Sequence, residues 1–288
     1  FRWDLIWTIL KRLVLASCIL AITAIVLQPY ILIDRIQVTK DLQLQLKMRT
    51  DAHIFPYTIQ YLGTRPYLYP LRQIFLWGIG PTLTLTALIG VFSTTVNAIK
   101  ELTKKRMFTP IAIIVTTIFV FFIPTGSSAV KFMRYYLPIY PLLIICGTVV
   151  LSYYWDSWKK WWQAGLLVAI ILPTTIWVIA FMSIYQQKHS WILASEWIHM
   201  NIPEGETIAV EHWDRSLPLY EVTRFKTLSL GLYEPDTEMK FDLLADQLNE
   251  TEYIILATNR LYGSIPKWPE KYPATIHYYG LLFSDSLG

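Results

Sequence analysis

Apolar residues gather into five long runs along the first two thirds of the chain, and polar stretches separate these runs. A helix needs roughly 17–25 predominantly apolar residues to cross the hydrocarbon core of a bilayer. The runs that reach this length are 13–33, 74–97, 107–124, 135–154 and 161–185. After Gln186 no run of this kind occurs. The pattern therefore predicts a multi-span α-helical membrane protein, with about five transmembrane helices in a membrane domain at 1–185.

The remaining residues, 186–288, alternate between helical and strand patterns. Apolar positions at i, i+3, i+4 and i+7 predict a helix through 241–248, which Asp236 or Thr237 can cap. The other predicted elements are helix 190–200, strand 208–211, strand 253–257 and helix 275–283. Such alternation is typical of a small α/β domain. Glycine-rich phosphate loops and the GxSxG and HExxH motifs are absent from the sequence.

The connection 34–73 is too long for a simple link between two spans. Its first part fits either an amphipathic helix or a short strand, and its second part is rich in tyrosine and proline. Aromatic faces suit sugar rings, and Gln60, Arg65 and Arg72 can hydrogen-bond hydroxyl or phosphate groups. An aromatic loop that rests on the bilayer surface fits the composition equally well.

Charge divides the chain at the same boundary as hydropathy. The chain is 54% hydrophobic and only 16% charged, whereas soluble domains carry about 25% charged residues. Residues 1–185 hold 17 Lys and Arg against 6 Asp and Glu, and residues 186–288 hold 8 against 15. The cations flank predicted spans, so membrane topology explains them and nucleic-acid binding is not indicated. The positive-inside tendency then predicts that 34–73, 125–134 and the C-terminal domain face outward, as in an integral plasma membrane protein.

Lys131 and Arg134 depart from this topology, since they fall in the short outward connection before the fourth span. One interpretation is that both side chains snorkel toward lipid headgroups within a belt of tyrosines. The other is a binding site for an anionic headgroup, in which Arg134 provides a forked phosphate donor and Lys131 a point charge. Pro138 and Pro141 would keep the start of the following helix irregular. The residues alone leave the two interpretations open.

Other candidate chemistry is sparse. Cys18 and Cys146 both lie in apolar runs, which argues against a disulfide framework. Asp51 and His53 could form an acid–base pair, but no third partner is visible. The motif EHWD, 211–214, could contribute to a metal site, although a structural turn or a loop facing the membrane site fits better. No metal site and no cofactor is predicted.

Four separated motifs resemble those of one enzyme family. They are FPYTIQYLGTRPYLYPLRQIFLWGIGP, KFMRYYLPIYPLL, AVEHWDRSLPLY, and TNRLYGSIPKWPEKYP with YYGLLFSDSLG. Together they resemble prokaryotic lipid-carrier-dependent glycosyltransferases of the GT-C superfamily, in its protein-mannosyltransferase-like branch. The resemblance runs from about Asp51 to the end of the chain.

The resemblance implies an enzyme whose site faces outward and whose donor is a polyprenyl-phosphate sugar. Lys131, Arg134 and Tyr135 would then bind the donor phosphate. The sugar or acceptor would contact Tyr57, Gln60, Arg65 and Tyr69. In the family the catalytic carboxylate lies in the first outer loop, so here it is expected upstream of Phe1, and the chain is expected to be an inactive C-terminal portion.

The partners implied are the lipid-linked sugar donor, membrane lipids and an acceptor that is a protein, lipid or glycan, but no nucleic acid. Metal dependence varies in the family. Two non-enzymatic alternatives remain. A lipid-carrier flippase or transporter predicts polar residues at mid-membrane depth, and these spans are almost free of charge. A membrane-anchored binding module would leave the aromatic loop and KFMRYYLP without a role.

Overall fold

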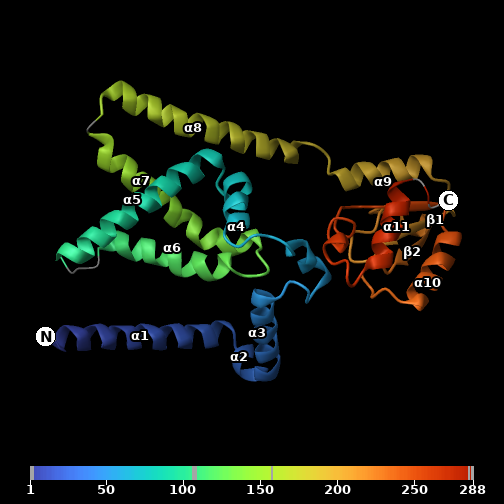
Figure 1. Ribbon diagram of the computed structural model, residues 1–288, viewed down its shortest axis with the longest axis horizontal. Coiled ribbons are helices and arrows are strands. Elements are labelled where there is room, and N and C mark those ends of the chain that lie inside the picture. The colour runs from blue at the N-terminus through green and yellow to red at the C-terminus, as the bar shows by residue number, and fades with distance from the viewer. Residues whose placement is uncertain (1–2, 106–108, 157, 285, 287–288) are drawn as a thin grey trace. The chain divides into compact units, whose positions relative to one another are not determined.

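The computed structural model describes residues 3–105, 109–156, 158–284 and 286 (Figure 1). The chain divides into two compact units, 1–50 and 51–288. Within these residues, four helical stretches are long and apolar enough to cross a membrane: Leu10–Leu27, Pro81–Lys104, Met133–Tyr153 and Lys160–Asn201. The predicted third span corresponds to a shorter apolar helix, Pro110–Gly126, and residues 107–108 of that prediction lie outside the described part of the chain. The described part of the chain is thus mostly helical, with four candidate spans where five were predicted.

The first unit contains three helices: α1 (Trp3–Leu27), α2 (Tyr30–Ile33) and α3 (Arg35–Thr50). The predicted span 13–33 is too long at its end, because the helix stops before Pro29, whose ring cannot continue an α-helix. The following segment, which fitted a helix or a strand, is a helix. Its first turn is held by Asp34, whose carboxylate accepts a hydrogen bond of 3.1 Å from the backbone amide of Gln37.

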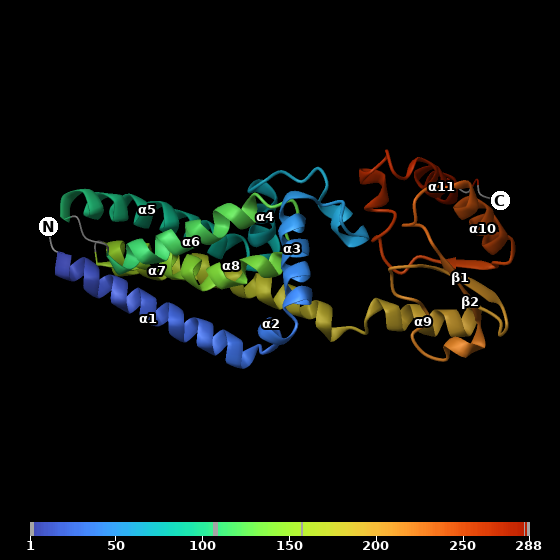
Figure 2. The ribbon, with the colours of Figure 1, turned by 90° about the horizontal axis from the view of Figure 1, so that it is seen from below.

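The second unit begins with a group of packed helices (Figures 1 and 2). They are α4 (Leu68–Gln73), α5 (Pro81–Lys105), α6 (Pro110–Gly126), α7 (Tyr140–Trp155) and α8 (Lys160–Met182). The predicted start of the second span at residue 74 is wrong, because Gly80 adopts a left-handed φ of 83° and separates the π-helical turn Ile74–Gly78 from α5. A 3₁₀ segment, Met133–Ile139, precedes α7, which confirms the irregular start predicted from Pro138.

Helices α5 and α7 cross closely at Gly90, where a Cβ atom would collide with the backbone of Cys146 and Gly147. Small residues permit such contacts between membrane helices. We expect Gly90→Ala to force these helices apart and to lower the free energy of unfolding by about 1–3 kcal/mol. Thermal unfolding in detergent measures the loss. Gly165→Ala in α8 is the matched control, since nothing lies within 4 Å of its Cβ position; equal melting temperatures for the two variants would contradict the close crossing.

The C-terminal lobe, residues 190–284, is built on a three-stranded parallel sheet. The strands are β1 (Thr207–Glu211), β2 (Lys226–Leu230) and β3 (Tyr253–Ile255), in the order β2-β1-β3. Helices α9 (Ser190–Asn201), α10 (Glu238–Asn249) and α11 (Pro273–Phe283) flank it (Figure 1). The helices agree with the predicted ranges, but β2 was not predicted, since KTLSL lacks the apolar residues of a buried strand.

The central strand β1 is buried on both faces, and its side chains point alternately to one face and to the other. Ile208 and Val210 join a cluster with Ile198 of α9. Ala209 lies on the other face, in a cluster with Leu244 of α10 and Tyr279 of α11. The lobe therefore has three layers, and its parallel strands all end at one edge of the sheet.

Candidate functional site

Lys131 is buried in the loop between α6 and the 3₁₀ segment, with 3% of its surface exposed. Its ammonium group donates hydrogen bonds to Thr64 Oγ1 at 3.0 Å and to the carbonyl of Ala129 at 3.2 Å. Within the described residues no carboxylate forms an ion pair with it. Burial lowers its pKa below the ordinary value for lysine. A buried cation of this kind is held without a counter-ion of its own, which is costly unless an anion binds beside it.

Arg134 is exposed and lies against aromatic rings rather than against a carboxylate. Its guanidinium carbon is 4.1 Å from the centroid of the Phe132 ring and 5.6 Å from that of Tyr135. In the described part of the chain no acceptor is hydrogen-bonded to its five N–H groups. Stacking on a ring fixes the plane of a guanidinium and leaves its edge free to donate to an anion.

The segment 51–73 packs beside these cations through its aromatic residues. The Tyr61 ring lies edge-on to the rings of Phe132 and Tyr69, with centroids 5.3 and 5.9 Å apart. Burial raises the pKa of the Tyr61 hydroxyl, and Arg134 is close enough to oppose that shift. Thr64 belongs to the same segment, so its contact with Lys131 ties the two parts of the predicted site together.

The same segment also packs against the C-terminal lobe. Ile59, which is 1% exposed, belongs to the buried cluster that contains Ala209 and Leu261. Lys267 Nζ donates a hydrogen bond of 2.6 Å to the carbonyl of Gln60. The segment is therefore positioned from two sides, by the loop that carries Lys131 and by the lobe.

A cavity of 480 Å³ lies between segment 51–73 and the lobe. The segment contributes Tyr57, Gln60, Thr64 and Tyr69 to its wall, and the lobe contributes, among others, Tyr233, Thr258, Asn259, Arg260 and Lys267. None of the described residues that line it is acidic. A polar wall with tyrosine rings and two cations suits a sugar that carries or adjoins a negative charge.

The sheet explains why the lobe presents these residues together. Tyr233 follows the end of β2, and Thr258 and Arg260 follow the end of β3. Loops at the carboxyl ends of parallel strands meet at one edge, which is the usual place for ligands in such sheets. The sequence motif TNRLYGSIPK contains most of the residues of this wall, but the sequence pattern did not predict a function for them.

Three of the four residues predicted to contact sugar or acceptor, Tyr57, Gln60 and Tyr69, thus line one cavity. The fourth, Arg65, is exposed outside it. Lys131, Arg134 and Tyr135 are not in its wall, but Lys131 reaches it through Thr64.

The two other candidate clusters make hydrogen bonds within the fold. Asp51 Oδ1 lies 2.6 Å from His53 Nδ1, and their hydrogen bonds lower the pKa of Asp51, which opposes a role as general base. In EHWD, the Glu211 carboxylate accepts a hydrogen bond from Tyr279. Across the residues that the structure describes, no group of three His, Cys, Asp or Glu could hold a metal ion.

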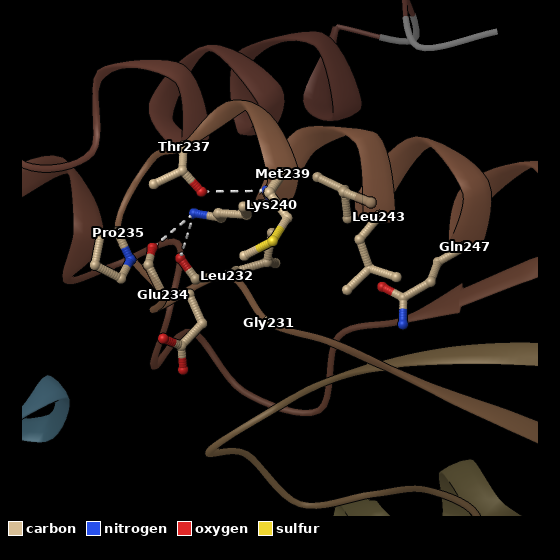
Figure 3. Close-up of a pocket in the computed structure, with 10 residues that line it drawn as sticks. Gly231, Leu232, Glu234, Pro235, Thr237, Met239, Lys240, Leu243 and Gln247 are labelled. Carbon is tan, nitrogen blue, oxygen red and sulfur yellow. Dashed lines mark hydrogen bonds between the residues drawn. The ribbon is translucent and has the colours of Figure 1, made fainter.

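A second cavity, of 340 Å³, lies beside α10 and is drawn in Figure 3. The cation in its described wall, Lys240, is already engaged, because its ammonium donates hydrogen bonds to the carbonyls of Leu232 and Glu234 and pairs with Asp236 at 2.8 Å. The rest of the wall is mainly apolar, apart from Glu234, Thr237 and Gln247, so the cavity offers no free cation for a phosphate.

Comparison with known proteins identifies a family. The sequence model of the Alg9-like mannosyltransferase family matches residues 54–209, just over half of the chain. The matched region includes segment 51–73 from residue 54 onward, together with Lys131 and Arg134. No curated protein and no solved structure matches. This chain therefore belongs to the Alg9-like mannosyltransferase family, a family of glycosyltransferases that use lipid-linked sugar donors.

Proposed function

We propose that this protein transfers a sugar from a polyprenyl-phosphate carrier to an acceptor at the outer face of the membrane. The observation that carries the proposal is the bond between Lys131 and Thr64. It places a buried ammonium group, with no carboxylate paired to it among the described residues, next to the wall of a polar cavity. Family membership supports the lipid-linked donor.

In this proposal the donor phosphate lies at Lys131 and Arg134, with Tyr135 beside them. As the bond between sugar and phosphate breaks, negative charge grows on the departing lipid phosphate. A preorganised ammonium and guanidinium stabilise that charge without having to reorient. The sugar occupies the cavity, where Tyr57 and Tyr69 offer rings and Gln60 offers hydrogen bonds.

The placement of the spans and of the lobe is part of the same proposal. Residues 1–185 form the membrane domain, and the C-terminal lobe lies outside the cytoplasm with the cavity. The basic connections flanking the spans support this orientation. The family description favours mannose as the sugar, and the resemblance to the protein-mannosyltransferase-like branch favours the same reaction class.

Arg134→Ala tests the phosphate site. We expect transfer from a polyprenyl-phosphate mannose to fall about tenfold or more, since a hydrogen bond to a charged group contributes about 1.5–3 kcal/mol. Arg134→Lys should recover only part of the loss, because an ammonium lacks the bidentate fork. Two quantities are measured with the intact protein in liposomes. They are the initial rate of sugar transfer and the affinity for polyprenyl phosphate without a sugar.

Arg49→Ala in α3 is the matched control, as Arg49 is an exposed arginine of the first unit. It should leave both values unchanged. Unchanged turnover and affinity in Arg134→Ala would remove Arg134 from the site.

A further inference from the structure

The turn that follows β1 presents an exposed tryptophan on a strained backbone. Trp213 has a φ of 64°, in the left-handed region that bulky residues rarely adopt, and 50% of its surface is exposed. Its neighbour Glu211 is only 2% exposed. Strain and exposed apolar surface both oppose folding. A glycine would avoid both, so the tryptophan at this position calls for an explanation other than stability.

Two side-chain hydrogen bonds hold the turn in this conformation. Asp214 Oδ2 accepts a hydrogen bond of 2.6 Å from Thr258 Oγ1, and the guanidinium of Arg260 donates to the carbonyl of Trp213. Both donors belong to the wall of the 480 Å³ cavity. The turn is therefore hydrogen-bonded directly to that wall, at the carbonyl of Trp213 and at the side chain of Asp214.

Contacts between aromatic rings also connect Trp213 to this cavity. The centroid of the His212 ring lies 6.5 Å from that of Trp213 and 5.9 Å from that of Tyr233, which lines the cavity. His212 itself is anchored, as its Nδ1 lies 2.9 Å from the carbonyl of Leu230. With these contacts made, half of the surface of Trp213 is still exposed.

We propose that Trp213 is a stacking platform for a hexose ring of the acceptor, at the edge of the cavity. This rests on the proposed function, in which the cavity holds the sugar that is transferred. An indole face packs against the C–H face of a sugar and excludes water from it. The polar, cationic wall beside the turn favours a saccharide over an apolar chain, and the strained backbone is explained because it aims the ring.

Trp213→Gly separates binding from stability. Glycine accepts a positive φ, and it keeps the carbonyl that Arg260 binds, so the melting temperature should be equal to or above that of the wild type. Mannobiose is the probe, titrated by saturation-transfer NMR against the intact protein in nanodiscs. We expect its affinity to fall about tenfold, while the affinity for polyprenyl phosphate is unchanged. Trp213→Phe should retain most of the binding.

Trp213→Leu distinguishes stacking from contact with the bilayer, because leucine is apolar but has no ring. Loss of mannobiose binding in this variant supports stacking, and retention overturns it. Trp197→Ala, at an exposed tryptophan of α9, is the control and should change nothing. If Trp213→Gly binds mannobiose like the wild type, Trp213 is not a stacking platform, and the proposed function is unaffected. If even the wild type binds no polyprenyl phosphate, the proposed function fails.

Discussion

Replacing Lys131 by methionine should reduce sugar transfer by at least about tenfold while leaving the fold as stable as before, or more stable. The ammonium group is buried and hydrogen-bonded to Thr64, which lines the cavity. A charged hydrogen bond to phosphate contributes about 1.5–3 kcal/mol. Methionine has a similar length and needs no counter-ion, so the cost of burying an unpaired charge disappears. On the same reconstituted sample, the transfer rate should therefore fall, while the melting temperature should stay the same or rise.

The pH dependence of the free energy of unfolding provides a second test of Lys131. Burial lowers the pKa of folded Lys131 below its ordinary value of 10.5. The unfolded chain then binds more protons than the folded one just below pH 10.5, so wild-type stability rises with pH in that range. Lys131→Met should lack this rise. Donor binding should also weaken at a lower pH than an ordinary lysine would require.

Thr64→Val is the matched control, because it removes the hydroxyl that Lys131 contacts but keeps the charge. Its effect on transfer should be smaller than that of Lys131→Met, since the donor phosphate can replace the lost acceptor. A loss of transfer in Lys131→Met that is accompanied by an equal loss of folded protein would show that Lys131 has a structural role instead.

Glu211→Gln is expected to stabilise the C-terminal lobe by about 3 kcal/mol at pH 8 and by little at pH 4. Burial of the carboxyl group, helped by the nearby Asp214 charge, raises the pKa of Glu211 to about 7, although the hydrogen bond from Tyr279 opposes this shift. One of its oxygens, Oε2, is buried without a hydrogen-bond partner, as is the hydroxyl of Tyr278 nearby. A shift of one unit corresponds to about 1.4 kcal/mol.

The direction in which stability changes with pH follows from proton binding by Glu211. Between pH 4.5, the ordinary value, and about 7, the folded lobe keeps a proton that the unfolded chain loses. Stability is therefore complete below pH 4.5, falls as the pH rises to about 7, and is constant above it. Glutamine is neutral at every pH and removes this decline.

Hydrogen exchange of the β1 amides, corrected for the intrinsic effect of pH, measures the local free energy of opening. Glu204→Gln, at an exposed glutamate of the same lobe, should show no such gain. If β1 protection in Glu211→Gln declines with pH as in the wild type, Glu211 is not the group that titrates.

Local sequence features predicted the local elements well, and the errors have identifiable causes. Apolar runs located the helices, but hydropathy averages over a window and misses the residue at which a helix breaks. Pro29 and Gly80 ended or delayed helices inside predicted spans. The strand β2 was missed because its solvent-facing residues dilute the apolar pattern, and pairing with β1 makes it a strand.

The candidate site was predictable in part for a similar reason. Lys131 and Arg134 stand out because cations are rare at the outer start of a span, and Tyr57, Gln60 and Tyr69 stand out as polar and aromatic residues in a long loop. Arg260 and Lys267 carry no such local signal. Lys267 meets Gln60 across 207 positions of sequence, and no window of residues records that contact.

The sequence by itself determined the class of protein, the approximate helices and the segregation of charge, because these depend on residues within a few turns of one another. Only the tertiary structure decided which candidates lie close together. It buried Lys131 beside Thr64, gathered the loops at the carboxyl ends of the strands, and closed a cavity between segment 51–73 and the lobe. Burial and convergence are properties of contacts between distant residues, and such contacts exist only after the chain has folded.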